Sequence, residues 1–194
     1  MALPELFLPS IAWMQAALQA PRLTVYQGIP MVRRSWQNRT YIKSAQGRLR
    51  ISVPVFQESK AEGYTKARID YALPWQRTVV RSLKNFYRSS PYFEHYGPEY
   101  LKVLQTHHAY LWSLNQSLIA LLFKHLGKST YALSPEEMPA YQGHWSLHRG
   151  CAPSAYQTPA YHQLYPPFQP NLSVLDLLFN EGPESRRLLI QPPA

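Results

Sequence analysis

The chain has 194 residues, of which 45% are hydrophobic and 16% are charged, and its formal net charge is +9. This balance excludes a disordered chain and fits one globular domain that spans residues 1–194. No apolar run is long enough to cross a membrane and no basic residues open the chain as in a signal peptide, so we expect a cytoplasmic protein without membrane insertion.

The N-terminal part predicts one amphipathic helix followed by several strands. Ser10 is placed to cap the helix, and Pro21 ends it. The expected strands are rich in β-branched or alternating apolar residues, and they are 23–26, 40–43, 49–55 and 66–69. The middle two form a hairpin in which Gly47 takes a positive φ.

The C-terminal part predicts mainly helices. Apolar residues at helical spacing, with proline or serine at the start, indicate four helices, at 74–88, 98–127, 173–179 and 183–190. Residues 129–133 predict one further short strand. The expected fold class is therefore α/β, a single compact domain with a small mixed sheet packed by several helices. The aromatic-rich residues 141–168 fit either a lid or a packed surface loop.

Positive charge is concentrated in the first third of the chain. Residues 6–57 contain seven Lys and Arg residues and no acid, which leaves a net charge of only +2 for the rest. Such an asymmetry favours anionic partners. A nucleic acid, a nucleotide-, phosphate- or coenzyme A-linked small molecule, and an acidic protein all qualify.

Several motifs along the chain resemble the WbqC-like family. The motifs include an aromatic-Pro pair and an Arg-Arg-x-Trp-x-Asn-Arg segment, and they lie at residues 7–9, 33–39, 41–43, 51–55, 69–71, 75, 87–93 and 168–183. Because members occur in surface-polysaccharide (O-antigen) loci and glycine transfer has been suggested, the resemblance implies an acyl or aminoacyl transferase. Two departures from the family pattern are Pro4-Glu5 in place of Gln-Pro, and Gln27-Gly28 in place of an acidic pair.

The basic segment is the first candidate binding site. Arginine forks bind phosphate or carboxylate through paired hydrogen bonds, tryptophan stacks on a base or sugar, and asparagine gives directed hydrogen bonds. The candidate donor-binding residues here are Arg33, Arg34, Trp36, Asn38, Arg39 and Lys43. The alternative is a solvated turn with Trp36 packed inward.

The start of the helix at 173–179 is the second candidate site. Its free N–H groups attract anions, and the polar residues around it are Gln169, Asn171, Ser173, Asp176 and Asn180. Helix capping by Ser173 and Asp176 is the favoured alternative.

Asp176 and His108 are the candidate catalytic residues, both as handlers of protons. Neighbouring helical residues point about 100° apart, so His107 and His108 do not converge on one metal, and a structural role competes with catalysis by His108. His144 and His148 lack the glutamate of a zinc-protease motif, and we expect no metal site. The sequence identifies no cofactor, and no residue in the sequence near Cys151, apart from His148 and Arg149, offers activation of a nucleophile.

A non-catalytic module that binds nucleic acid through its basic hairpin is the rival interpretation. Its affinity would fall steeply with salt because it depends on counterion release. Aromatic residues do not interleave with the basic ones as a stacking platform requires, so the transferase interpretation is preferred.

Overall fold

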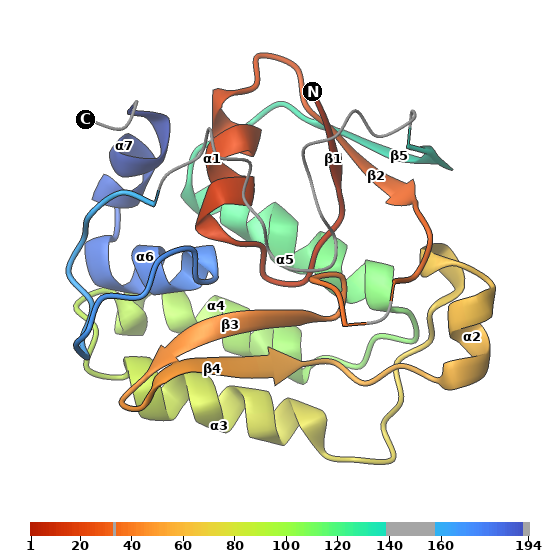
Figure 1. The fold of residues 1–194 in the computed structure, drawn as a ribbon, viewed down its shortest axis with the longest axis horizontal. Coiled ribbons are helices and arrows are strands. Elements are labelled where there is room, and N and C mark those ends of the chain that lie inside the picture. The colour runs from red at the N-terminus through yellow and green to blue at the C-terminus, as the bar shows by residue number, and fades with distance from the viewer. Residues whose placement is uncertain (33, 139–157, 192–194) are drawn as a thin grey trace.

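Three short parallel strands form one sheet in the computed structural model, which describes residues 1–32, 34–138 and 158–191 (Figure 1). These strands are β1 (Ala2–Pro4), β2 (Thr24–Gly28) and β5 (Ala132–Glu137), and β2 lies between the other two. Parallel neighbours need a crossover connection, and α1 (Ile11–Gln19) provides it between β1 and β2. Leu3 and Val25 are fully buried, so the sheet contributes directly to the core.

A two-stranded antiparallel hairpin forms the second sheet, from β3 (Arg39–Ser44) and β4 (Gly47–Ser52). Gly47 has a φ of 110°, which glycine adopts without strain at the end of the two-residue turn. One side of the hairpin is buried through Ile42 and Ile51, whereas alternate residues of β4 are exposed. The hairpin therefore has one face in the core and one in solvent.

Helices pack around both sheets (Figure 1). They are α2 (Gln57–Ala61), a 3₁₀ turn η1 (Tyr64–Lys66), α3 (Trp75–Tyr87), α4 (Phe93–Gln105), α5 (Leu111–His125), α6 (Val174–Glu181) and α7 (Glu184–Ile190). The central helix α5 has four leucines without exposed surface, at 111, 114, 118 and 122. In the described part of the chain, no helix could span a bilayer, since the longest has 15 residues and about 20 are needed.

The starts of α1 and α6 lie side by side although they are far apart in the sequence. Ile11 N donates to Leu172 O at 3.0 Å, and Val174 N donates to Pro9 O at 2.9 Å. The Asn171 side chain adds a hydrogen bond from Ala12 N at 3.1 Å. Each segment thus satisfies backbone groups that the other helix leaves free at its first turn.

The mixed α/β class predicted from the sequence is confirmed, but some elements differ. The expected helix 98–127 is two helices, and Pro98 lies inside α4, which begins five residues earlier at Phe93. Phe93 and Tyr96 are buried, and their packing outweighs the hydrogen bond that proline removes. The segment between the two helices contains His107 and His108. The expected strand 66–69 was wrong, because this segment makes only isolated bridges, and the short β1 was not predicted.

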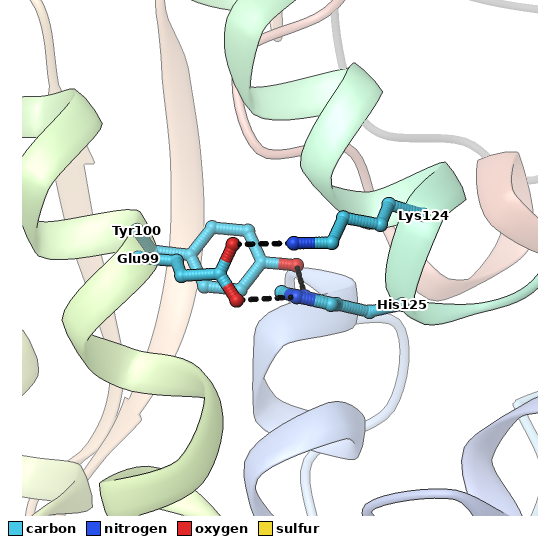
Figure 2. A network of polar contacts seen from close by, with 4 residues as sticks. All are labelled: Glu99, Tyr100, Lys124 and His125. Carbon is cyan, nitrogen blue, oxygen red and sulfur yellow. Dashed lines mark hydrogen bonds and ion pairs between the residues drawn. The ribbon is translucent and has the colours of Figure 1, made fainter.

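A polar cluster ties α4 to α5 at the surface (Figure 2). Glu99 accepts hydrogen bonds from Lys124 Nζ at 2.8 Å and from His125 Nε2 at 3.1 Å, and Tyr100 Oη lies 3.0 Å from His125 Nδ1. The bonds to Lys124 and His125 hold the pKa of Glu99 below its usual range. This cluster joins the two helices and touches neither candidate site described below.

Two glycines with positive φ allow a matched test of the local packing. A Cβ at Gly182 (φ 55°) would lie 2.5 Å from the Tyr92 ring, whereas a Cβ at Gly47 would meet no atom within 4 Å. Gly47→Ala should therefore lower the free energy of unfolding by only about 1–2 kcal/mol, which is the cost of a positive φ for alanine. Gly182→Ala should lower the free energy of unfolding by roughly 1–3 kcal/mol more, as measured by urea unfolding, because Tyr92 must move and because the ψ of −126° at Gly182 is unfavourable for alanine. Equal losses in the two variants would contradict the contact with Tyr92.

Candidate functional site

The outward side of the hairpin carries Arg39, Tyr41, Arg48 and Arg50, which we call the basic face. These side chains share one side because residues alternate along a strand and Tyr41 lies opposite Arg50. The Arg48 guanidinium lies 4.3 Å from the centroid of the Tyr41 ring, and Trp36 packs on the same ring with centroids 5.5 Å apart. The basic face is thus organised around one tyrosine.

The arginines of the basic face have no carboxylate partner among the described residues, whose three ion pairs all lie elsewhere. The Nε of Arg39 is buried without a hydrogen-bond partner. Burial lowers the pKa of Arg39, and the neighbouring charge of Arg50 lowers it further. A bound anion would relieve this repulsion and supply an acceptor for the guanidinium groups.

The loop before β3 brings Arg34 toward the basic face. Gln37 holds this loop, since its side chain donates to Pro30 O at 2.8 Å and accepts from Val32 N at 2.7 Å. Arg34 is exposed with a φ of 57°, and its charge also acts on Arg39. Arg33 lies outside the described residues.

Trp36 and Asn38, from the same motif, have structural roles. Trp36 is only 3% exposed, so its ring packs inward and has no face open to a ligand. Asn38 Nδ2 donates to Val53 O at 2.8 Å and thereby extends the pairing of the hairpin. The structure thus gives a packing role to the residue expected to stack on a donor.

Asp176, predicted as catalytic, lies in a buried cluster beside the other end of β3. It accepts hydrogen bonds from Tyr87 Oη at 2.6 Å, Tyr161 Oη at 2.5 Å and Gln163 Nε2 at 3.1 Å. Burial raises the pKa of Asp176, against the opposing effect of these hydrogen bonds and of Lys43. Asp176 is thus a fully buried acid with three donors, which come from two distant segments of the chain.

Lys43 shares this cluster rather than the arginine loop. Its Nζ donates to Pro167 O at 2.5 Å, and its backbone N donates to Tyr87 Oη at 2.9 Å. Burial lowers the pKa of Lys43, while the charge of Asp176 opposes that shift. Because Lys43 lies on the same strand face as Arg39 and Tyr41, the cluster and the basic face are neighbours along β3.

The polar residues at the start of α6 make capping and loop contacts. Ser173 Oγ accepts from Leu175 N at 3.4 Å, as expected of an N-cap, and Asn171 Oδ1 caps α1. Gln169 exchanges two backbone hydrogen bonds with the Gln163 side chain. Asn180 Nδ2 donates to Asp176 O at 2.7 Å, while its buried Oδ1 has no partner. These residues thus lie around the Asp176 cluster, on α6 and in the loop before it.

His108, the other predicted catalytic residue, lies in the turn between α4 and α5. Its Nδ1 is 3.2 Å from Ser113 Oγ, its backbone N donates to Tyr71 Oη, and its Nε2 is buried without a partner. Burial lowers the pKa of His108. No hydrogen bond among the described residues joins it to Asp176, so the two predicted catalytic residues occupy separate places.

Glu5 is a buried acid that our sequence interpretation noted only as a departure from the family pattern. It follows β1 and accepts from Tyr64 Oη at 2.9 Å and from Gln27 Nε2 at 3.4 Å, and Asn115 Nδ2 donates to Tyr64 Oη at 2.8 Å. Burial raises the pKa of Glu5 to about 7. Gln27, which lies in β2 at a position where the family pattern has an acid, thus contacts the carboxylate of Glu5 directly after β1.

Sequence reasoning also missed Tyr87, Tyr161, Gln163 and Tyr64. Tyr87 belongs to a motif that carried the resemblance, but nothing local indicates that its hydroxyl meets Asp176. In the described part of the chain, no group of three His, Cys, Asp or Glu residues is placed to hold a metal ion. His144, His148 and Cys151 lie outside the described residues.

Comparison with known proteins gives the family. The WbqC-like protein family matches residues 5–149 and 152–188 of the chain. The chain belongs to the WbqC-like protein family. It is 24% identical to the uncharacterized protein Rv1507c of Mycobacterium tuberculosis over 194 aligned positions, which cover 83% of this chain and 84% of that protein. No solved structure matches.

The Glu5 cluster predicts an unusual pH dependence of stability. A carboxyl whose pKa rises on folding, here from 4.5 to about 7, disfavours the folded state increasingly as pH rises between those values. This effect should remove about 3 kcal/mol of unfolding free energy above neutral pH. Glu5→Gln should abolish the loss, so that the variant is more stable than the native protein at alkaline pH, as measured by urea unfolding across pH.

The exposed Glu62 provides the control, since Glu62→Gln leaves the buried Glu5 in place and should keep the loss of stability at alkaline pH. A native protein whose stability rises steadily from acid to alkaline pH would contradict the buried state of Glu5.

Proposed function

We propose that this WbqC-like protein is a cytoplasmic transferase of surface-polysaccharide (O-antigen) synthesis. It moves an acyl or aminoacyl group, glycyl in the leading case, from an anionic donor to a sugar. The observation that carries the proposal is the row of arginines without acidic partners beside a buried Lys43–Asp176 cluster. Family membership supplies the polysaccharide context.

The basic face supports binding of a nucleotide-, phosphate- or coenzyme A-linked donor. Arg39 offers an unsatisfied Nε, and Arg34, Arg48 and Arg50 add positive charge around it. Guanidinium groups bind phosphate oxygens through paired hydrogen bonds. The donor's charged end would lie on the arginines, which leaves its acyl end free to extend along β3 toward Lys43.

The Asp176 cluster supports the proton transfer that such a reaction requires. An acceptor hydroxyl or amine attacks the acyl carbonyl, the bond to the donor's phosphate or thiol breaks, and the acceptor's proton must leave. Tyr161 is half-buried and donates its own hydroxyl proton to Asp176. A proton from the acceptor can therefore reach Asp176 through Tyr161, and a buried carboxyl with a raised pKa accepts it.

A thermal-shift screen tests the binding half of this proposal. The panel holds nucleotide sugars, acyl-coenzyme A species, aminoacyl analogues and short oligonucleotides at low and moderate salt. One small-molecule donor class should stabilise the native protein, because a ligand that binds the folded state raises its melting temperature. Arg39→Ala should lose this shift, whereas Arg22→Ala, an exposed arginine outside the hairpin, should keep it.

A transfer assay with the donor so identified tests the chemical half. Asp176→Asn should bind the donor but lose about 100-fold or more of its turnover, as removal of a positioned base does. Tyr161→Phe tests the same relay without altering the buried carboxyl. Stabilisation by oligonucleotides alone, lost as salt rises, would overturn the proposal and favour a nucleic-acid-binding module.

A further inference from the structure

The outer edge of β4 carries backbone groups that no described residue pairs. On β3, Lys43 N donates to Tyr87 and Tyr41 O accepts from Ser173, so the backbone groups of these residues point away from β4. Their register partners on β4 are Arg48 and Arg50, and Ser52 follows in the same alternation. In an antiparallel pair such partners both point outward, so these three residues form a free strand edge.

An apolar groove of about 350 Å³ runs between this edge and α3. Figure 1 shows α3 lying alongside the hairpin, on the side of β4. The apolar residues that line the groove include Leu49, Ile51, Pro54, Leu73, Trp75 and Val79. Leu73 is 69% exposed at its mouth, which is high for a large apolar side chain. The groove therefore offers apolar contact beside a row of backbone donors and acceptors.

The β4 wall of the groove is basic. Arg48 and Arg50 are exposed on β4, and neither β4 nor α3 contains an acidic residue. The residues that α3 contributes to the groove are uncharged: Trp75, Thr78, Val79 and Ser82. The exposed cations of α3, Arg77, Arg81 and Lys84, lie on the opposite side of that helix. Negative charge on a strand that docks here would thus favour its binding.

These features select one kind of occupant. Two copies of this chain paired through β4 would bring like charges of Arg48 and Arg50 together, which disfavours self-association. Exposed arginines on an edge strand are enough to protect it against pairing with other chains. An apolar groove with an exposed Leu73 is not needed for that protection. A nucleic acid would use the cations but neither the row of backbone groups nor the groove.

We propose that the β4 edge docks an extended acidic segment of a partner protein, which adds as a further strand to the hairpin. Backbone hydrogen bonds to residues 48–52 would give affinity, and alternate side chains would enter the groove. The inference does not require the proposed transferase activity, because the docked strand uses the outward backbone groups of β4. Arg48 and Arg50 belong to both surfaces, so the tests below use Ser52 and Leu73, which lie outside the basic face.

Fluorescence anisotropy with a short labelled peptide of alternating Glu and Val tests the docking. Ser52→Pro removes an outward N–H that the hairpin does not use, and proline is tolerated on such an edge. This variant should bind about fivefold or more weakly than the native protein, as expected for loss of one backbone hydrogen bond. The matched variant Ser52→Ala keeps the N–H and should bind like the native protein.

A second pair of variants keeps the test valid if Ser52→Pro fails to fold. Leu73→Glu places a negative charge at the groove mouth and should weaken binding, while Leu73→Lys should bind the acidic peptide more tightly than Leu73→Glu. The same peptide N-methylated at every second residue retains its charge but loses donors, and should not bind. Equal binding of the methylated peptide, or equal affinity of both Leu73 variants, would overturn the proposal.

Discussion

A single buried carboxylate, Asp176, joins segments of the chain that are far apart in the sequence. It accepts hydrogen bonds from Tyr87 at the end of α3 and from Tyr161 and Gln163 in the segment before α6. It also acts electrostatically on Lys43 in β3. A buried acid is costly unless its oxygens are satisfied, so α3, α6, the preceding segment and the hairpin must take up their places together.

Local signals explain why much of the fold could be predicted. The hairpin, α3, α6 and α7 follow from alternation, helical spacing and capping, and Gly47 adopts the positive φ that its turn requires. The start of α4 could not be predicted in this way, because the burial of Phe93 and Tyr96 extends the helix through Pro98. Packing between distant elements decides such positions, and periodicity does not report it.

The candidate site was predictable in composition but not in arrangement. The arginine-rich segment and Asp176 stand out by residue type, yet only the fold places Lys43 beside Asp176 and turns Trp36 into the core. Glu5 gave no local signal, because its raised pKa arises from burial beside Tyr64 and Asn115. Residues that interact across the whole chain length cannot be paired from one sequence alone.

The side-by-side starts of α1 and α6 have a consequence for biosynthesis. Ile11 and Ala12 donate to Leu172 and Asn171, which are synthesised about 160 residues later. The first helix is therefore synthesised well before the groups that complete its first turn. Contacts between residues so distant in the sequence slow folding, because the long intervening chain must be ordered before they form. The contacts between the starts of α1 and α6 thus form only after residues 171 and 172 have been synthesised.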